Sequence, residues 1–442
     1  MLASRFRVAV AVLFTSVPCC LAQTCSVAEP IKAGDCFNVR LEMTLKGKLH
    51  IQKNGTASDL PLEAAGSHAF DERILALGTS NLPEKSARRY TAARAIIQVA
   101  SDRSERTLRP ERSLLVAQRV KDQTLVYCPA GGLRRSELEL TSEHFDTLAL
   151  PGVLPGKDVQ AGDTWKLANS VAQGLCNFEG LTEHTLTGKL ESVSNGVANF
   201  SISGTASGID EGAMVKLSVE ATGHFDIASK RLTTLEWRQK DEREQGPVSP
   251  ASTVETTTKV ERKAIDQPNN LSDVALVSVP DKEPPSAMLN LECADVKGRF
   301  ELMHPREWQI VSQTPDHVVL RLVERGDFVA QATITPWKSA EKGQHLSPEA
   351  FKDAMNSTPG WEPERELQAN EVPADGDGRW IYRLSEQGQL DSVAVVQNFY
   401  LIAAPSGEQV VVAVTMTPKQ ADKLGARDLT LVASLVLTAN AK

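Results

Sequence analysis

The sequence predicts a mainly β protein in two parts, an N-terminal antiparallel β-sandwich or half-barrel followed by an α/β/α layer domain of the α+β class. Three observations support this prediction. Apolar and polar residues alternate repeatedly between residues 23 and 263, a proline-containing segment follows at 264–295, and strand and helix patterns then alternate over 296–442. Because 442 residues exceed what one hydrophobic core usually supports, we expect two domains joined by a linker at 264–295.

The N-terminus has the features of a secretory signal peptide over residues 1–22. Arg5 and Arg7 precede an apolar run from Val8 to Val17, and small residues stand before Gln23. The run is shorter than the roughly 20 residues that span a bilayer, and no later segment approaches that length. The mature chain is therefore expected to be secreted or periplasmic, without a transmembrane segment. The contexts "SVPC" and "AQTC" fit a lipidation signal poorly. Lipidation of the N-terminus is nevertheless left open by the sequence.

The charge of the chain argues against nucleic acid as a partner. The formal net charge is −8, and removal of the signal peptide with its two arginines makes it about −10.

The mature chain keeps five cysteines, and an oxidising compartment allows disulfides between them. Cys25 with Cys36 and Cys128 with Cys176 are plausible pairs, although spacing does not fix the connectivity, and Cys293 is left over. No C-x-x-C or zinc-ligand spacing occurs, so we expect neither redox nor zinc chemistry.

The first domain shows the period-two pattern of half-buried strands. "CFNVRLEMTL", residues 36–45, alternates apolar and polar side chains, and Asn195-Gly196 between two alternating runs predicts a hairpin. "ELTSEHFDTLAL", residues 139–150, predicts a helix capped by Thr141 or Ser142. "RQKDEREQGPVSPAST", residues 238–253, predicts a solvated hairpin tip. Further strands are expected at 86–101, 113–120, 123–128, 183–194, 197–206, 213–227 and 230–240.

An arginine series in this acidic protein has two interpretations. It could form a basic patch for an anionic lipid, polysaccharide or protein partner. Alternatively, the arginines decorate the solvent face of edge strands and pair with nearby acids such as Glu105 and Glu111. The patch residues are Arg88, Arg89, Arg94, Arg103, Arg106, Arg109 and Arg112.

The second domain begins with strand patterns and continues with a capped helix. Ser347 is a good N-cap, Pro348 takes the first helical position, and Phe351 and Met355 share a face. Three further strands follow. Thr417 and Pro418 then open a C-terminal helical segment that includes Leu435 and Val436 and that Gly425 breaks in two.

Three resemblances accompany this layout. The stretches "LRPERSLLVAQR", "LPGKDVQAGDTW" and "KDEREQGPVSPA" resemble secreted bacterial proteins of planctomycete type over about residues 36–263, which implies export and a β-rich fold but no catalytic residues. In topology alone this part is similar to the half-barrel of LolA-type lipoprotein carriers. The opening pattern Phe300, Pro305 and Trp308 resembles the PsbP-like domain over about residues 296–440. Members of that family act mostly as binding or assembly modules, so the resemblance implies an interaction role.

Motifs for catalysis, metals or cofactors are absent from the sequence. The eight histidines have no metal-ligand spacing, and no G-x-S-x-G, P-loop or G-x-G-x-x-G occurs. Asp375 and Asp377 take calcium-loop places, but Arg379 stands where an oxygen ligand is required, so a turn is favoured. We expect no cofactor and no metal.

The function expected from the sequence is that of an exported, non-enzymatic binding or assembly protein. Its expected partner is an envelope protein, a lipid or a polysaccharide. The alternative is a secreted hydrolase with a site at the domain junction, for which the candidate residues are His144, His184 and His304.

Overall fold

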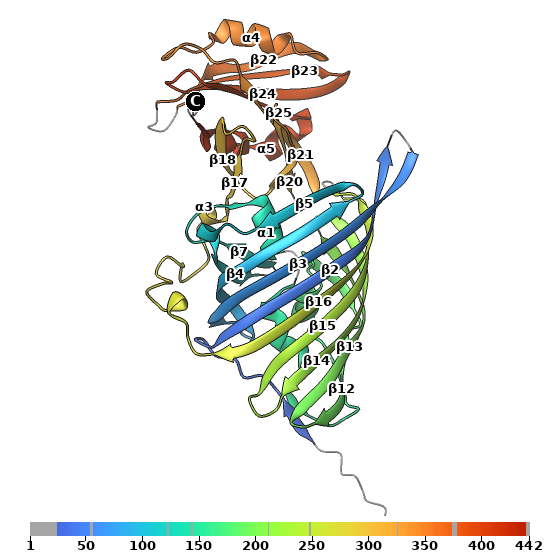
Figure 1. Cartoon of the computed structure of the whole chain (residues 1–442). Coiled ribbons are helices and arrows are strands. Elements are labelled where there is room, and N and C mark those ends of the chain that lie inside the picture. The colour runs from blue at the N-terminus through green and yellow to red at the C-terminus, as the bar shows by residue number, and fades with distance from the viewer. Residues whose placement is uncertain are drawn as a thin grey trace, which may run out of the picture.

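The chain folds into a large curved sheet and a smaller α/β part that lies at one end of it (Figure 1). This computed structural model describes residues 24–53, 56–121, 123–142, 145–210, 212–246, 249–324, 326–373 and 378–438. The predicted signal peptide, His144, Asp375 and Asp377 lie outside these residues. Within them, no helix has both the length and the apolar character that crossing a membrane requires.

One antiparallel sheet of thirteen strands forms the first part, in the order β10-β12-β13-β14-β15-β16-β2-β3-β4-β6-β7, with β11 beside β13 and β5 beside β4. Among the described residues this is one curved sheet, not two sheets packed face to face. Its strands are β2 (Cys36–Lys53), β3 (Thr56–Leu77), β4 (Pro83–Val99), β5 (Asp102–Thr107), β6 (Leu114–Val120), β7 (Gln123–Tyr127), β10 (Thr164–Lys166), β11 (Gly180–His184), β12 (Thr187–Ser194), β13 (Val197–Asp210), β14 (Ala213–Asp226), β15 (Arg231–Arg243) and β16 (Ala251–Ile265).

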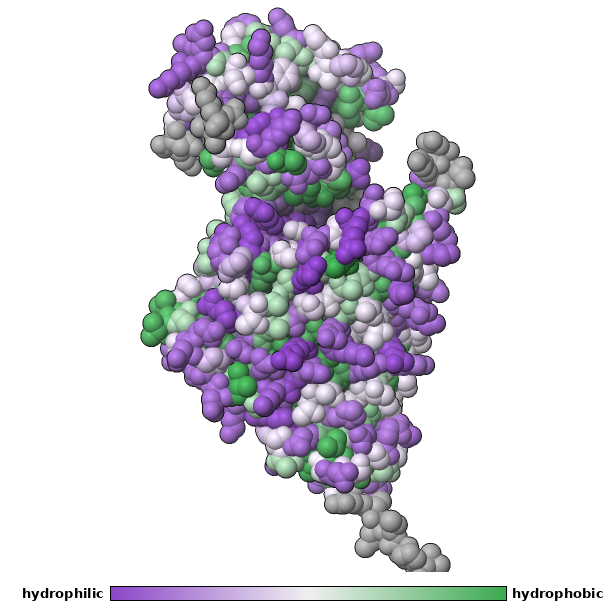
Figure 2. All heavy atoms as spheres, in the orientation of Figure 1, coloured by the Kyte–Doolittle hydropathy of each residue, from purple (hydrophilic) through white to green (hydrophobic). Residues whose placement is uncertain are grey.

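Side-chain alternation gives this sheet an apolar concave face and a polar outer face. In β2, Phe37, Val39 and Leu41 are buried on the concave face, while Glu42 and Lys46 are exposed on the other. Hydrophilic colours dominate the outer face in Figure 2. The predicted hairpin is confirmed, since Asn195 and Gly196 join β12 to β13 with φ angles of 51° and 78°, the values that a tight primed turn requires.

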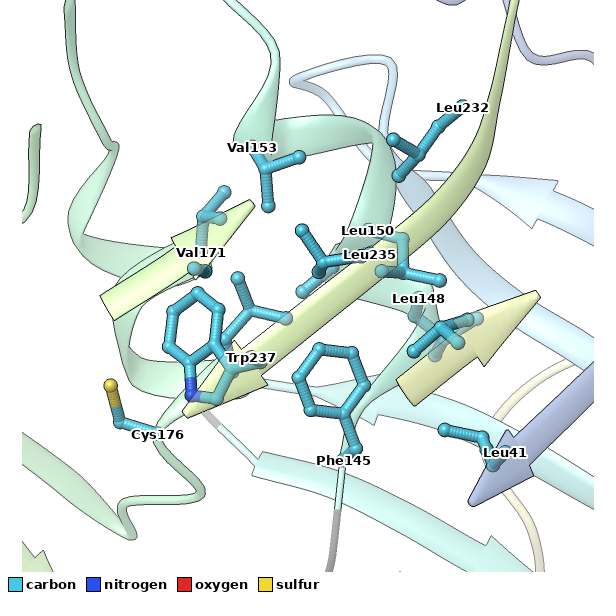
Figure 3. Packing of buried hydrophobic residues seen from close by; sticks show 14 of the residues in the cluster. Leu41, Phe145, Leu148, Leu150, Val153, Val171, Cys176, Leu232, Leu235 and Trp237 are labelled. Atoms are coloured by element: carbon cyan, nitrogen blue, oxygen red, sulfur yellow. The ribbon is translucent and has the colours of Figure 1, made fainter. Parts of the chain in front are cut away.

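A compact segment between β7 and β11, which we call the plug (residues 135–178), fills part of the concave face. In Figure 3, Phe145 of the plug lies beside Trp237 of β15, and the two ring centroids are 6.0 Å apart in an edge-on arrangement. Trp165 donates from Nε1 to the Val153 carbonyl at 2.9 Å. The plug comprises α1 (Arg135–Ser142), η2 (Thr147–Val153), β9 (Lys157–Val159), which pairs with β1 (Cys25–Val27), β10 and α2 (Asn169–Leu175).

The prediction of one helix over 139–150 was wrong in its bounds and its cap. Helix α1 starts earlier, and Thr141 and Ser142 close its last turn, where their hydroxyls donate to the carbonyls of Glu137 and Leu138. They therefore do not cap its N-terminus. A separate 3₁₀ helix, η2, follows, and Asp146 caps it by accepting from the Leu148 amide.

The second part is built on a seven-stranded sheet in the order β19-β20-β21-β25-β24-β23-β22. Helix α4 packs on one face through Phe351 and Met355, and the C-terminal helices pack on the other through Leu424 and Leu431. The elements are β19 (Trp308–Gln313), β20 (Val318–Glu324), β21 (Asp327–Trp337), α4 (Pro348–Asn356), β22 (Trp361–Glu371), β23 (Trp380–Leu390), β24 (Val393–Ala403), β25 (Gln409–Met416), η4 (Pro418–Gln420), α5 (Ala421–Leu424) and α6 (Arg427–Ala433).

The helix signals of this part are mostly confirmed. Ser347 accepts from the Ala350 amide as the N-cap of α4, and Gly425, with φ 57°, separates α5 from α6. The prediction for Leu435 and Val436 was wrong, because they form β26 (Leu435–Leu437), which pairs with β18 (Phe300–His304). This edge pairing prevails over the helical spacing of their side chains.

Residues 264–295 do not form a free linker. They contain η3 (Asn269–Leu271), α3 (Ser286–Leu289) and β17 (Leu291–Ala294), and Leu271 and Leu276 are buried against Ala87 and Leu114 of the large sheet. Strand β17 pairs with β18 and also, in parallel, with β8 (Leu133–Arg134) of the first part. The two parts therefore share a four-stranded sheet, ordered β26-β18-β17-β8.

Arg109 ties this shared sheet to the plug. Its Nε and Nη2 donate to the two carboxylate oxygens of Glu137 at 2.7 and 2.8 Å, and its Nη1 donates to Glu292 of β17 at 3.0 Å. The Glu137 side chain is only 2% exposed. The hydrogen bonds to Glu137 raise the pKa of Arg109 above its usual range, with a smaller contribution from Glu292.

We predict that Arg109→Gln lowers the free energy of unfolding by about 3–5 kcal/mol, because it leaves Glu137 buried without its cation. Urea or guanidinium unfolding measures this loss. The matched control is Arg94→Gln, which breaks the solvent-exposed pair with Glu105 and should cost less than about 1 kcal/mol. Equal losses in the two variants would contradict the role given to Arg109.

Candidate binding cavity

A cavity of about 1030 Å³ lies between the concave face, the plug and the second part of the chain. This volume is at the upper end of the range typical of small-molecule sites. Its walls come from strands β2–β7 and β13–β16, from the plug, and from residues around the β18–β19 connection and the β20–β21 hairpin of the second part.

The walls of the cavity are apolar where the concave face extends beyond the plug. Leu45 of β2 lies directly opposite Ala64 of β3 on one side and Thr256 of β16 on the other, and Ala64 in turn lies opposite Ile97. These residues all line the cavity. Leu45, Ala64 and Ile97 are only half-buried, whereas Leu41 on the same face is buried against the plug core. Apolar surface is therefore left uncovered inside the molecule.

The second part forms the roof. Arg306 lines the cavity from the β18–β19 connection and Gln309 from the start of β19, while Val323 and Gly326 line it from the β20–β21 hairpin. Gly326 approaches Gly212, at the β13–β14 turn, so closely that a Cβ at position 326 would lie 3.2 Å from the Gly212 Cα. Figure 2 shows a hollow where the two parts meet. The second part thus contacts the first part at the β13–β14 turn as well as at β8.

A series of side-chain hydrogen bonds runs along β15 into the cavity. Trp237 donates from Nε1 to the Gln239 Oε1 at 2.8 Å, and Gln239 donates from Nε2 to the Asp241 Oδ2 at 2.9 Å. The series ends at Asp241, because its Oδ1 is buried and has no hydrogen-bond partner among the described residues. Burial raises the pKa of Asp241 to about 6, against the opposing hydrogen bond from Gln239. Asp241 also adds to the effect of burial in raising the pKa of Cys176.

The structure does not gather the seven arginines of the predicted patch on one surface. Arg88 is buried on the concave face against Glu72, with Nε 3.0 Å from Oε1, and Arg94 and Arg103 are exposed on strands. Alternate strand residues point to opposite faces, which disperses the series. Of the remaining members, Arg89 contacts Ser113 and Arg106 contacts Glu139. Arg109 and Arg112 lie together, because both pair with Glu292 and both donate to the Gly132 carbonyl.

The expected disulfides are not formed in the structure. Its five described cysteines are buried free thiols, so neither Cys25–Cys36 nor Cys128–Cys176 is joined. Cys25 lies in β1 and Cys36 starts β2, while Cys128 follows β7 and Cys176 follows α2 in the wall of the cavity.

The histidines proposed for hydrolysis have packing partners in the structure. His184 hydrogen-bonds Asn169 through Nε2 at 3.1 Å and accepts from the Leu186 amide. His304, which is fully buried in β18, contacts the Pro305 carbonyl through Nδ1. Among the described residues, no three His, Cys, Asp or Glu side chains cluster in a way that could hold a metal ion.

Comparison with known proteins adds likeness of fold only. No protein family model matches the chain, and no curated protein matches it. The structure is similar to cyanobacterial PsbP from Synechocystis sp. PCC 6803, at 17% identity over 34% of this chain and 92% of that one, with a TM-score of 0.27. It is also similar to the Ran-binding protein Mog1p of Saccharomyces cerevisiae, at 14% identity over 34% and 95%, with a TM-score of 0.25. A lipovitellin structure matches 54% of this chain and 26% of its own length at 8% identity, with a TM-score of 0.28.

We predict that Asp241→Asn makes the protein more stable at neutral pH. Because the folded-state pKa of about 6 lies above the ordinary value of 3.8, the folded state binds the proton more tightly, and stability is lost as pH rises through this window. The gain of the variant should be near zero at about pH 4 and should reach up to about 3 kcal/mol above about pH 6.

Urea unfolding of both proteins across this pH range tests the prediction. Glu242→Gln, at the next residue along β15 and exposed on the outer face, is the control and should show no such pH-dependent gain. A pH-independent difference between Asp241→Asn and the native protein would contradict it.

Proposed function

We propose that the protein is an exported, non-enzymatic binding protein that carries an elongated apolar ligand, a lipid, in the cavity of a half-barrel. We further infer that residues 296–442 form a PsbP-like domain whose role here is to cover that cavity. Export is taken from the signal peptide expected in the sequence.

One observation carries the proposal. The apolar rows of the concave face continue beyond the plug, and Met43, Leu45 and Leu62 are half-buried there around a space of about 1030 Å³. A packed protein interior leaves few voids larger than a water molecule, so a space of this size and lining supports occupation by an apolar ligand.

The placement of the second part also supports a carrier. Because the β8–β17 pair and the Gly212–Gly326 contact hold the roof at two places, the second part would cover a bound chain on that side of the cavity. Burial of apolar ligand surface contributes about 25 cal/mol per Å², and the polar outer face keeps the loaded protein compatible with water.

Binding of the fluorescent apolar probe N-phenyl-1-naphthylamine to the mature protein tests the proposal. Ala64 lines the cavity, so Ala64→Trp should fill part of it and weaken probe binding about tenfold or more. The matched control is Ala92→Trp on β4, where the side chain is exposed on the outer face, and binding should be unchanged.

Two results would contradict the proposal. One is that the native protein does not enhance probe fluorescence. The other is that Ala64→Trp and Ala92→Trp bind the probe equally well while both remain folded by circular dichroism.

A further inference from the structure

A group of guanidinium side chains lines the cavity where the roof meets the plug. Arg306 comes from the β18–β19 connection, Arg135 from the start of α1, and Arg106 from β5, and all three line the cavity. Arg106 and Arg135 both contact the same carboxylate, Glu139, with the Arg135 Nε at 2.9 Å. Three guanidinium groups therefore line this corner, and the Glu139 carboxylate is paired with two of them.

Arg306 differs from the other cavity arginines in its partners. Its Nε donates to the Leu289 carbonyl at 2.8 Å and its Nη2 to the Val126 carbonyl at 2.6 Å, so backbone carbonyls fix the guanidinium plane. Among the described residues, no carboxylate forms an ion pair with Arg306, and nothing accepts a hydrogen bond from its Nη1. Glu307, the next residue, also lines the cavity, but its side chain is exposed and is not ion-paired to Arg306.

The electrostatic setting of Arg306 is unfavourable without an anion. Burial, together with a smaller contribution from the positive charge of Arg135, lowers the pKa of Arg306 to about 10. A guanidinium favours carboxylate and phosphate oxygens as partners because its planar donors match their geometry. An anion bound at Nη1 would supply the missing acceptor and offset the repulsion between the two arginines.

We propose that the ligand is a single-chain amphiphile with an anionic head, a carboxylate or a phosphate, that binds Arg306 with Arg135 beside it. This inference rests on the function proposed above and names the class of ligand. The chain of the amphiphile lies along the apolar rows of Leu45 and Ala64.

Binding of two probes that differ only in the head group tests the assignment. cis-Parinaric acid carries a carboxylate, and its methyl ester is neutral with the same chain. The native mature protein should bind the acid about tenfold or more tightly than the ester, since a hydrogen bond to a charged group discriminates by about this factor. Arg306→Gln should remove this preference, Arg306→Lys should keep part of it, and Arg135→Gln should reduce it.

Arg238→Gln is the matched control, because the Arg238 side chain is 66% exposed, and it should leave the preference unchanged. Displacement of parinaric acid by dodecyl phosphate and by dodecanoate then identifies the head group. The stronger competitor shows whether the site suits phosphate or carboxylate. Either result supports an anionic head.

Three results overturn the inference in distinguishable ways. If the native protein binds acid and ester equally, the anionic head is wrong and the lipid-binding function stands. If the preference survives both Arg306→Gln and Arg135→Gln, the head does not bind at this corner. If neither probe binds, the proposed function fails together with the inference.

Discussion

The structure depends on one constraint: a single curved sheet with an apolar concave face must have that face covered. A β-sandwich covers each sheet with the other, but here thirteen strands form one sheet, so the cover has to come from other segments. The plug supplies part of it through Phe145, Leu148 and Trp165. The second part of the chain roofs the remainder without filling it, and this incomplete filling creates the cavity.

The same constraint explains why the two parts are joined so firmly. A roof held only by a flexible linker would leave the concave face open to water, whereas residues 264–295 pack on the sheet and end in a strand shared by both parts. Arg109 reinforces this junction with two carboxylates, one from each side. The junction is thus part of how the apolar face is kept from solvent.

The sequence predicted several of the regular elements but not the cavity. Alternation in β2 and β14 and the Asn195-Gly196 turn gave strands and a hairpin that the structure contains. Strands β3 and β16 were missed because their concave-face residues are small or hydroxylated, such as Ala64, Gly66 and Thr256, and so give no alternating apolar signal. These same small side chains leave the space open. Asp241 and Arg306 stand in charged stretches that resemble solvated turns, and only long-range pairing places them inside.

The pairing of β2 with β16 has a consequence for how the chain folds. Cys36 lies opposite Ile265, so one edge of the long strand β2 cannot be completed until β16 has been synthesised. Until then, β2 and β3 form a hairpin with an open row of amide and carbonyl groups, which is a template for strands of other molecules. Such long-range closure is slow compared with local pairing. The interval before β16 arrives is therefore the period in which the newly made chain is most exposed to edge-to-edge aggregation and to capture by chaperones.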